Sequence, residues 1–196
     1  MHLHASARAR EAWGCACCSG GVQVSHTDTD WTRLASRCAR GVMVRKGVTY
    51  DDVAQGFASL GIEESLRGLN GKIQRGSFQC SFFLQFLCAC GAAIPRSWAP
   101  HLTRRVDWCE SSRRIYIEER RAVARASSLP VAAVEAALAQ PDLALVREGL
   151  LERGTFPFTW LLQLAAFAPV PAIELYLDRD DIVAAARANA IVFEGR

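Results

Sequence analysis

The sequence predicts an all-α protein made of two related four-helix units in tandem. Residues 75–87 and residues 153–165 carry the same phrase at a constant offset of 78, in which Arg, Gly, Phe and Gln recur as identities and apolar positions recur in class. Self-similarity at a fixed period indicates duplicated structural units. Apolar residues elsewhere fall at helical spacing, and no stretch alternates in the manner of a half-buried strand.

Composition and charge narrow the classes of protein that fit. Apolar residues make up 51% of the 196-residue chain and charged residues 22%, so the chain has enough apolar side chains to build cores. The net charge is +3, but residues 29–95 carry +3, residues 96–126 carry +4 and residues 127–196 carry −4. The first two-thirds of the chain therefore suit a polyanionic partner, which the last third would repel.

The sequence predicts a soluble, cytoplasmic protein. No apolar run approaches the roughly 20 residues that a membrane-spanning helix needs, and the charged N-terminus lacks the apolar core of a secretory signal. Residues 1–28 are rich in Ala, Gly, Ser, His and Cys without apolar periodicity, which predicts a flexible tail. In the cytoplasm the eight cysteines are expected to be reduced.

The first unit, residues 29–95, is expected to hold four helices, each marked by apolar residues at helical spacing. A glycine ends each of them, because glycine adopts the left-handed backbone that closes a helix. The helices are expected from Trp31 to Gly47, from Thr49 to Gly61, from Glu63 to Gly76 and from Ser77 to Gly91.

The second unit, residues 113–196, follows a linker at residues 96–112 and repeats the pattern with losses. Its first helix is strongly basic, and proline opens the next one, since proline is tolerated in the first turn of a helix. Helices are expected at residues 113–125, after Pro130, at residues 158–168 and at residues 180–190, the last without a counterpart in the first unit.

Two motifs of the first unit resemble known sequences. Residues 48–54 (Val-Thr-Tyr-Asp-Asp-Val-Ala), followed by a helix that ends in Arg-Gly, resemble the helix-turn-helix of lambda-repressor-like domains. Residues 72–78 (Lys-Ile-Gln-Arg-Gly-Ser-Phe) are similar to the signature of a bacterial family of short helical domains of unknown function. The resemblance covers about residues 30–93, with a weaker second copy at residues 107–170. It implies a repressor-like fold, although the connection at residues 60–65 exceeds the usual turn of about 3–4 residues.

The resemblance implies that the third helix is a recognition helix. Its candidate DNA contacts are Arg67, Asn70, Lys72, Gln74 and Arg75. Arg reads guanine, and Asn or Gln reads adenine, in the major groove. The alternative is a solvated face whose cations stabilise the helix dipole, and Glu63 and Glu64 oppose a polyanion. Arg75 recurs as Arg153 in the acidic unit, which favours a role for the Arg-Gly pair in shaping the turn.

The remaining charged helices favour other roles. The face of the second unit that corresponds to the third helix offers Arg147, Glu148 and Glu152, so we expect this unit to pack on the first or to self-associate. The basic helix has the charge to hold phosphates. Glu118 and Glu119 lie within reach of its arginines, however, which favours internal pairing.

The sequence contains no pattern typical of a catalytic or metal site. It lacks a Gly-rich phosphate loop, H-E-x-x-H and a nucleophile elbow, and His101 is the only histidine beyond residue 26. Cys15, Cys17 and Cys18 lack the paired spacing of zinc ligands. The other cysteines are expected to be buried, small apolar side chains. We therefore expect no enzymatic activity, no metal and no cofactor.

The leading interpretation is a regulatory protein that binds double-stranded DNA through the first unit. The alternative is a non-catalytic protein-interaction module of helical repeats, in which the third helix is a plain surface. An antitoxin-like or phage-derived accessory protein is a third interpretation, which the sequence does not separate from the first. A contiguous positive surface over the first and third helices favours DNA, whereas a broad exposed apolar patch favours a protein partner.

Overall fold

The protein is all-α, as the sequence predicts. A computed structural model describes residues 29–102, 106–138 and 144–189, so the predicted tail at residues 1–28 lies outside the described residues. Within these ranges no strand forms, and the extended pairing is an isolated bridge between Gln79 and Pro157. The helices are α1 (Asp30–Lys46), α2 (Tyr50–Ser59), α3 (Leu66–Arg75), α4 (Cys80–Ala89), η2 (Ala99–His101), α5 (Trp108–Ser127), α6 (Val131–Leu138), α7 (Ala144–Glu152), α8 (Thr159–Phe167), α9 (Pro171–Glu174) and α10 (Arg179–Ala188).

The caps and stops of the first helices follow the predicted chemistry. Thr49 caps α2 in a capping box, in which its hydroxyl accepts from the Asp52 amide and the Asp52 carboxylate accepts from the Thr49 amide. Gly47 closes α1 and Gly76 closes α3, both in the left-handed conformation. The sequence therefore locates these helix ends correctly.

The starts of α3 and α4 differ from the prediction. Helix α3 begins at Leu66 rather than at Glu63, because the Ser65 hydroxyl accepts from the Gly68 amide and caps the helix there. Helix α4 begins at Cys80 rather than at Ser77. The intervening residues are extended and pair with a distant part of the chain, which keeps them out of the helix.

In the second half, the basic helix α5 begins before its predicted start at Arg113. Asp107 accepts hydrogen bonds from the amides of Cys109 and Glu110, so α5 starts at Trp108, inside the segment predicted to be a linker. Helices α8 and α10 lie close to their predicted bounds. Helices η2 and α9 were not predicted, because each is a single short turn with proline near its start.

One apolar core spans both halves of the chain. The Phe83 ring of α4 stacks on Phe158 with ring centroids 3.9 Å apart, and Phe78 stacks on the same Phe158 ring at 5.7 Å. Tyr116 of α5 contacts Phe156 at 5.0 Å. All five aromatic side chains are buried. Because the rings of the two halves share one cluster, neither half buries its apolar surface alone.

The two repeated segments contact each other directly at the centre of this core. The Cys80 amide donates to the Phe156 carbonyl at 2.9 Å, and the Phe158 amide donates to the Phe78 carbonyl at 2.9 Å. These two hydrogen bonds flank the bridge between Gln79 and Pro157. The phrase that the sequence repeats is thus the place where the chain pairs with itself.

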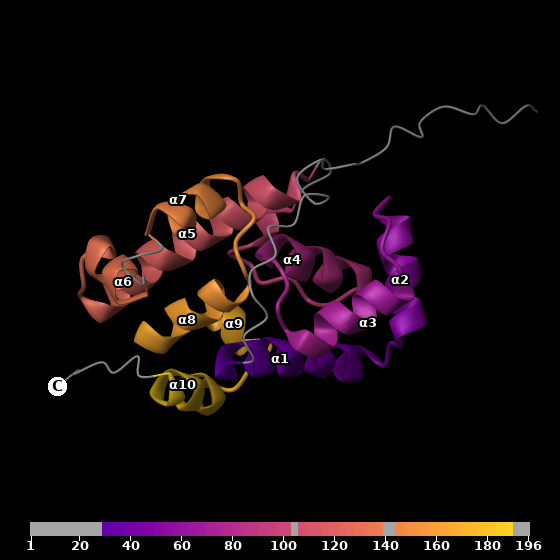
Figure 1. Cartoon of the computed structure of the whole chain (residues 1–196), viewed down its shortest axis with the longest axis horizontal. Coiled ribbons are helices and arrows are strands. Elements are labelled where there is room, and N and C mark those ends of the chain that lie inside the picture. Colours follow the sequence, from indigo (N-terminus) through magenta and orange to yellow (C-terminus); the bar gives the residue numbers. More distant parts are fainter. Residues whose placement is uncertain (1–28, 103–105, 139–143, 190–196) are drawn as a thin grey trace, which may run out of the picture.

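The helices around this pairing pack across the two halves. Helix α4 packs on α5, and α8 packs on α1. Helix α10 packs on both α1 and α8, and Arg37 of α1 binds Asp181 of α10 at 2.8 Å. Figure 1 shows α2 and α6 at opposite ends of the molecule, with α4 and α8 between them. The second half therefore packs on the first, one of the two roles predicted for it.

Gly76 and Gly154 hold the repeated segments against the neighbouring helices. Both have a left-handed backbone, with φ of 65° and 66°. A Cβ at Gly76 would overlap the Thr32 carbonyl of α1, and a Cβ at Gly154 would overlap the Cys109 carbonyl of α5. Backbone geometry and close approach therefore both require glycine at these positions.

We predict that Gly76→Ala lowers the free energy of unfolding by about 3 kcal/mol or more, because strain at positive φ adds to a backbone overlap. Gly47→Ala is the matched control, since Gly47 has φ of 64° with open space around its Cβ position. It should cost only about 1 kcal/mol. Urea unfolding followed by tryptophan fluorescence measures both values. Equal losses of unfolding free energy in the two variants would show that the close packing at Gly76 does not contribute to stability.

Candidate nucleic-acid interface

Helices α2 and α3 carry the residues that the sequence identifies as candidate DNA contacts. Val53 and Phe57 of α2, with Leu69 and Ile73 of α3, are fully buried and fix which sides of the two helices face inward. The connection between them runs from Leu60 to Ser65, the longer form that the sequence indicates. The opposite side of α3 is left facing solvent.

The five predicted contacts do not share one surface. Arg67, Gln74 and Arg75 are exposed, whereas Asn70 and Lys72 are half-buried. At about 100° per residue, Asn70 lies beside Gln74 and Arg67 on the helix, and Lys72 leaves the helix on the opposite flank. The structure therefore groups Arg67, Gln74 and Arg75 outward and separates Lys72 from them.

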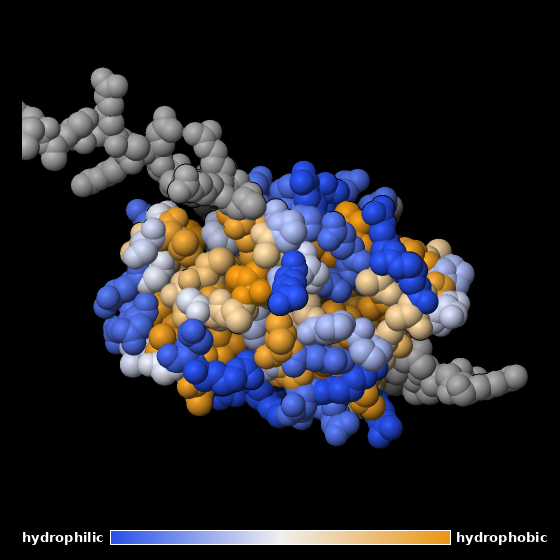
Figure 2. Space-filling model, turned by 180° about the vertical axis from the view of Figure 1, so that it is seen from behind, coloured by the Kyte–Doolittle hydropathy of each residue, from blue (hydrophilic) through white to orange (hydrophobic). Residues whose placement is uncertain are grey.

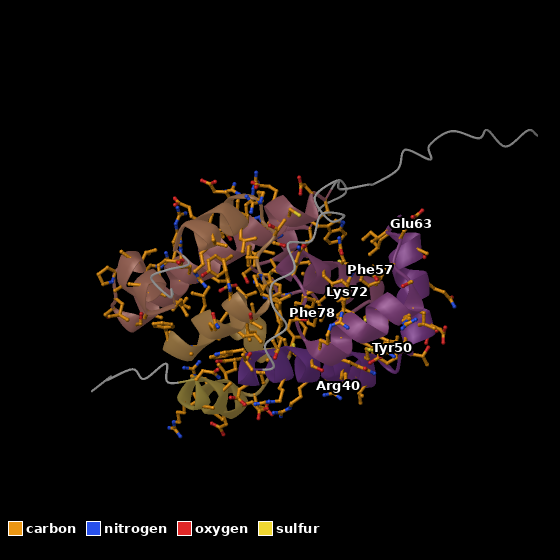
Figure 3. The ribbon with its side chains drawn as sticks, viewed as in Figure 1. Arg40, Tyr50, Phe57, Glu63, Lys72 and Phe78 are labelled. Carbon is orange, nitrogen blue, oxygen red and sulfur yellow. The ribbon has the colours of Figure 1, made fainter. Side chains whose placement is uncertain are left out.

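Lys72 is paired with neighbouring side chains, although its own side chain is 40% exposed. Its ammonium forms an ion pair with the Glu64 carboxylate and lies over the Phe82 ring, 5.2 Å from the centroid. The carboxylate reaches it across Gly68, where a Cβ would overlap Glu64 Oε1. Figure 3 shows Lys72 between α3 and α4, and Glu63 beyond the far end of α2. Lys72 thus neutralises an acid next to α3.

Arg75 lies along its own helix. Its guanidinium covers Gly71, since a Cβ there would stand 2.9 Å from Arg75 Nη1. Arg153 covers Gly149 in the same way, at 3.2 Å from Nη1. This recurrence supports the predicted structural role of the Arg-Gly pair. Because Arg75 is still exposed, its charge remains on the outer face of α3.

Asn70 carries an unusual polar atom. Its Oδ1 is shielded from solvent and accepts no hydrogen bond from the part of the chain that the structure describes. An unsatisfied buried acceptor costs about 1–3 kcal/mol. The Asn70 amide therefore has hydrogen-bonding capacity that the fold does not use, at the edge of the exposed face of α3.

Two cations of α1 add to the positive charge of the first unit. Arg40 and Lys46 are exposed and form no ion pair with the described residues. Figure 3 shows Arg40 on the outer edge of α1. Arg45, by contrast, donates to the Tyr176 carbonyl at 3.4 Å and so contacts the second half. Helical periodicity places Arg40 opposite the buried residues of α1. Arg45 and Lys46 follow the buried Cys38 and Ala39 by seven residues and are exposed because they lie in the last turn.

The basic helix α5 is paired internally, but with other acids than the sequence suggests. Glu110 accepts hydrogen bonds from Arg113 at 2.7 Å and from Arg114 at 2.6 Å. These bonds hold the pKa of Glu110 down at about 2. The predicted partners of these arginines were Glu118 and Glu119. Glu118 instead lies 3.0 Å from Nε2 of His101, and Glu119 accepts a hydrogen bond from Nε1 of Trp98 at 2.7 Å.

In the second half, α7 corresponds to α3. Its acidic side chains face solvent, and its arginine faces the interior. Arg147 turns inward, with its guanidinium 3.8 Å from the centroid of the Trp160 ring. Glu135 holds Arg120 at 2.7 Å and approaches Arg147 at 4.0 Å. Glu148 and Glu152 are exposed. The side of α7 that faces solvent therefore carries two carboxylates, with the exposed Arg153 directly after the helix.

The described cysteines have the character of core residues. Burial raises the pKa of Cys80 and of Cys90 to about 12, and it raises the pKa of Cys38 as well. Among the described residues no group of His, Cys, Asp and Glu is arranged to hold a metal ion. Cys15, Cys17 and Cys18 lie outside the described residues.

A shallow open groove lies beside α2. Its volume is about 570 Å³, and Ala54, Ala58 and Ile62 line it together with Glu63 and Glu64. Figure 2 shows the molecule from behind, where apolar side chains gather toward the end at which α2 lies and polar side chains follow the lower edge. This end of the molecule has the small apolar surface that a protein partner would use.

Comparison with known protein families gives a match within the first half of the chain. Residues 31–94 match the family model described as a domain of unknown function (DUF6471), which is consistent with the expected resemblance to a family of domains of unknown function. No curated protein and no solved structure matches the chain. No helix in the described ranges combines the length and apolar character that crossing a membrane requires.

We predict that an NMR pH titration finds the pKa of Glu110 near 2, and that Arg113→Gln with Arg114→Gln raises it toward the usual value of about 4.3. Because the pKa is depressed in the folded state, the stabilisation is present above about pH 4.3 and is lost as the pH falls toward 2. Asp52 is the control, since the Thr49 amide lowers the pKa of that carboxyl independently of α5. An unchanged Glu110 pKa in the double variant would contradict the pairing.

Proposed function

We propose that the chain is a non-catalytic regulatory protein of the cytoplasm that binds double-stranded DNA on the outer face of α3. The observation that carries the proposal is the group Arg67, Gln74 and Arg75. These side chains are exposed together, and none of them forms an ion pair or a hydrogen bond with another side chain in the described ranges. Guanidinium and amide groups suit guanine and adenine edges, and guanidinium also binds phosphate.

The neighbouring groups support the same role. Asn70 has an unused acceptor at the edge of this face. Arg40 and Lys46 of α1 supply exposed charge that suits the phosphate backbone. Lys72 contributes indirectly, because it neutralises Glu64 and so lowers the repulsion that this acid would exert on DNA. The proposed contacts are therefore Arg67, Asn70, Gln74 and Arg75, with Lys72 in a supporting position.

The arrangement of α2 and α3 fits a helix-turn-helix-like use of α3. Both helices are held by fully buried apolar residues, so the exposed face of α3 is a rigid surface. The longer connection at residues 60–65 places Glu63 near the start of α3. We therefore propose that the C-terminal part of α3, with Gln74 and Arg75, approaches the duplex more closely than its N-terminal part.

The groove beside α2 favours a second candidate function, which is docking of a protein partner. Its small apolar floor and the exposed Glu63 carboxylate suit a segment with apolar and basic side chains, since Glu64 is already paired with Lys72. This use does not involve Arg67 or Arg75. The two functions therefore predict different effects of removing the α3 arginines.

We predict that Arg67→Ala and Arg75→Ala each lower the affinity for a mixed-sequence duplex about tenfold, because each removes a charge from the proposed contact face. Fluorescence anisotropy at about 50 mM and about 200 mM salt measures the affinity. Each lost phosphate contact should reduce the slope of log K against log salt by about 1.

The matched control is Arg121→Ala, which removes the same charge from an exposed position of α5. It should change the affinity less than twofold. Lys72→Ala should mainly reduce stability, since Lys72 is occupied by Glu64 and Phe82. No salt-dependent duplex binding, or equal losses in the Arg67 and Arg121 variants, would overturn the proposed function and leave the groove as the candidate site.

A further inference from the structure

The contacts between the two halves are reciprocal. Under the offset of 78, Phe78, Gln79 and Cys80 correspond to residues 156–158. The Cys80 amide donates to the Phe156 carbonyl. The equivalent bond in the other direction runs from the Phe158 amide to the Phe78 carbonyl, and both bonds are 2.9 Å long. The bridge joins Gln79 to its own equivalent. Reciprocity of this kind is what a two-fold axis produces at an isologous interface.

The surroundings of the two segments correspond as well. Gly76 presses on the carbonyl of Thr32, which follows Trp31 of α1. Gly154 presses on the carbonyl of Cys109, which follows Trp108 of α5. Both tryptophans are buried, and in both halves an arginine covers a glycine of the preceding helix. Helix α1 packs on α3, and helix α5 packs on α8. The correspondence between the two surroundings therefore lies at the two glycines, the two arginines and the two tryptophans.

Helix packing across the halves follows the same rule. Helix α4 packs on α5, and its counterpart α8 packs on α1. Figure 1 shows α3 and α7 on opposite sides of the centre, as α2 and α6 are. The surface that a single unit would offer to a second copy is therefore already covered by the other half of the same chain.

Helices α3 and α7 occupy corresponding places but differ in charge. The outer face of α3 presents Arg67, Gln74 and Arg75, whereas α7 presents Glu148 and Glu152, followed by the exposed Arg153 at the place of Arg75. Arg147, the cation of α7, is turned onto Trp160. In a two-fold dimer of helix-turn-helix type both helices would enter successive major grooves. Here one of the two positions is cationic and the other is anionic.

We infer that the chain is an internal two-fold pair of helical units that binds duplex DNA as a monomer at a single, non-palindromic half-site, with α7 over the adjoining stretch of the duplex. The inference rests on the proposed function, since it assigns the kind of DNA site that α3 binds. The second half covers the surface through which the first half would pair with a second copy of itself. The carboxylates of α7 repel the adjoining duplex, so the bound DNA site is limited to one half-site.

The first test measures the mass of the full chain by light scattering at high concentration. The expected mass is that of one chain, 21.5 kDa. A dimer would overturn the inference, because it would show that the internal pairing does not satisfy the interface.

The second test uses mixed-sequence duplexes of about 12 and about 24 base pairs, which span one and two half-sites, since half-sites lie about 10 base pairs apart. Glu148→Lys with Glu152→Lys should raise affinity for the longer duplex about tenfold and for the shorter one less than twofold. The control, Asp178→Lys with Asp180→Lys, makes the same change in charge at exposed positions next to and within α10. It should give the same small gain on both duplexes.

The outcomes separate the two proposals. A parent chain that binds DNA, with no greater gain for the Glu148 and Glu152 variant than for the control, overturns the placement of α7 and leaves the proposed function intact. A parent chain that binds neither duplex overturns the proposed function and the half-site assignment with it. The mass measurement still decides the internal pairing in that case.

Discussion

The reciprocal backbone pairing of residues 78–80 with residues 156–158 is the constraint on which the rest of the structure depends. Five buried aromatic rings lie in or beside it, and the backbone groups that they shield from water bond each other. Because Gln79 is extended, α4 begins only at Cys80, and α8 begins at Thr159, directly after the paired segment. The direction in which each helix leaves the pairing then places α4 on α5 and α8 on α1.

The charge on the surface of each half is set by which acidic and basic side chains pair with each other. Acids and bases that are close enough neutralise one another, as Lys72 does with Glu64 and as Arg113 and Arg114 do with Glu110. What remains on the outside distinguishes the two halves. Arginine and amide side chains remain on α3, whereas carboxylates remain on α7. The proposed role in DNA binding depends on this remainder rather than on the net charge of the chain.

Much of the local structure follows from the sequence, and the exceptions share a cause. The ends of α1 and α3 were predicted from Gly47 and Gly76, since a left-handed stop is a local property of the backbone. The start of α4 was not, because the amide of its first residue, Cys80, donates to the carbonyl of Phe156 in the other half of the chain. The candidate contacts were predicted as one set of five. Lys72 differs from the others in that Glu64, eight residues away along the chain, pairs with it, a contact that the sequence did not predict.

The sequence by itself determined that the protein is helical, where most helices lie and that one phrase occurs twice, because periodicity, caps and glycine stops act over a few residues. Only the tertiary structure decided that the two phrases bind each other, that Arg147 turns onto Trp160 and that Glu119 accepts from Trp98. These contacts join distant parts of the chain. Which side chains form these contacts depends on the distances between them and on their burial. Both are fixed only when the helices have packed.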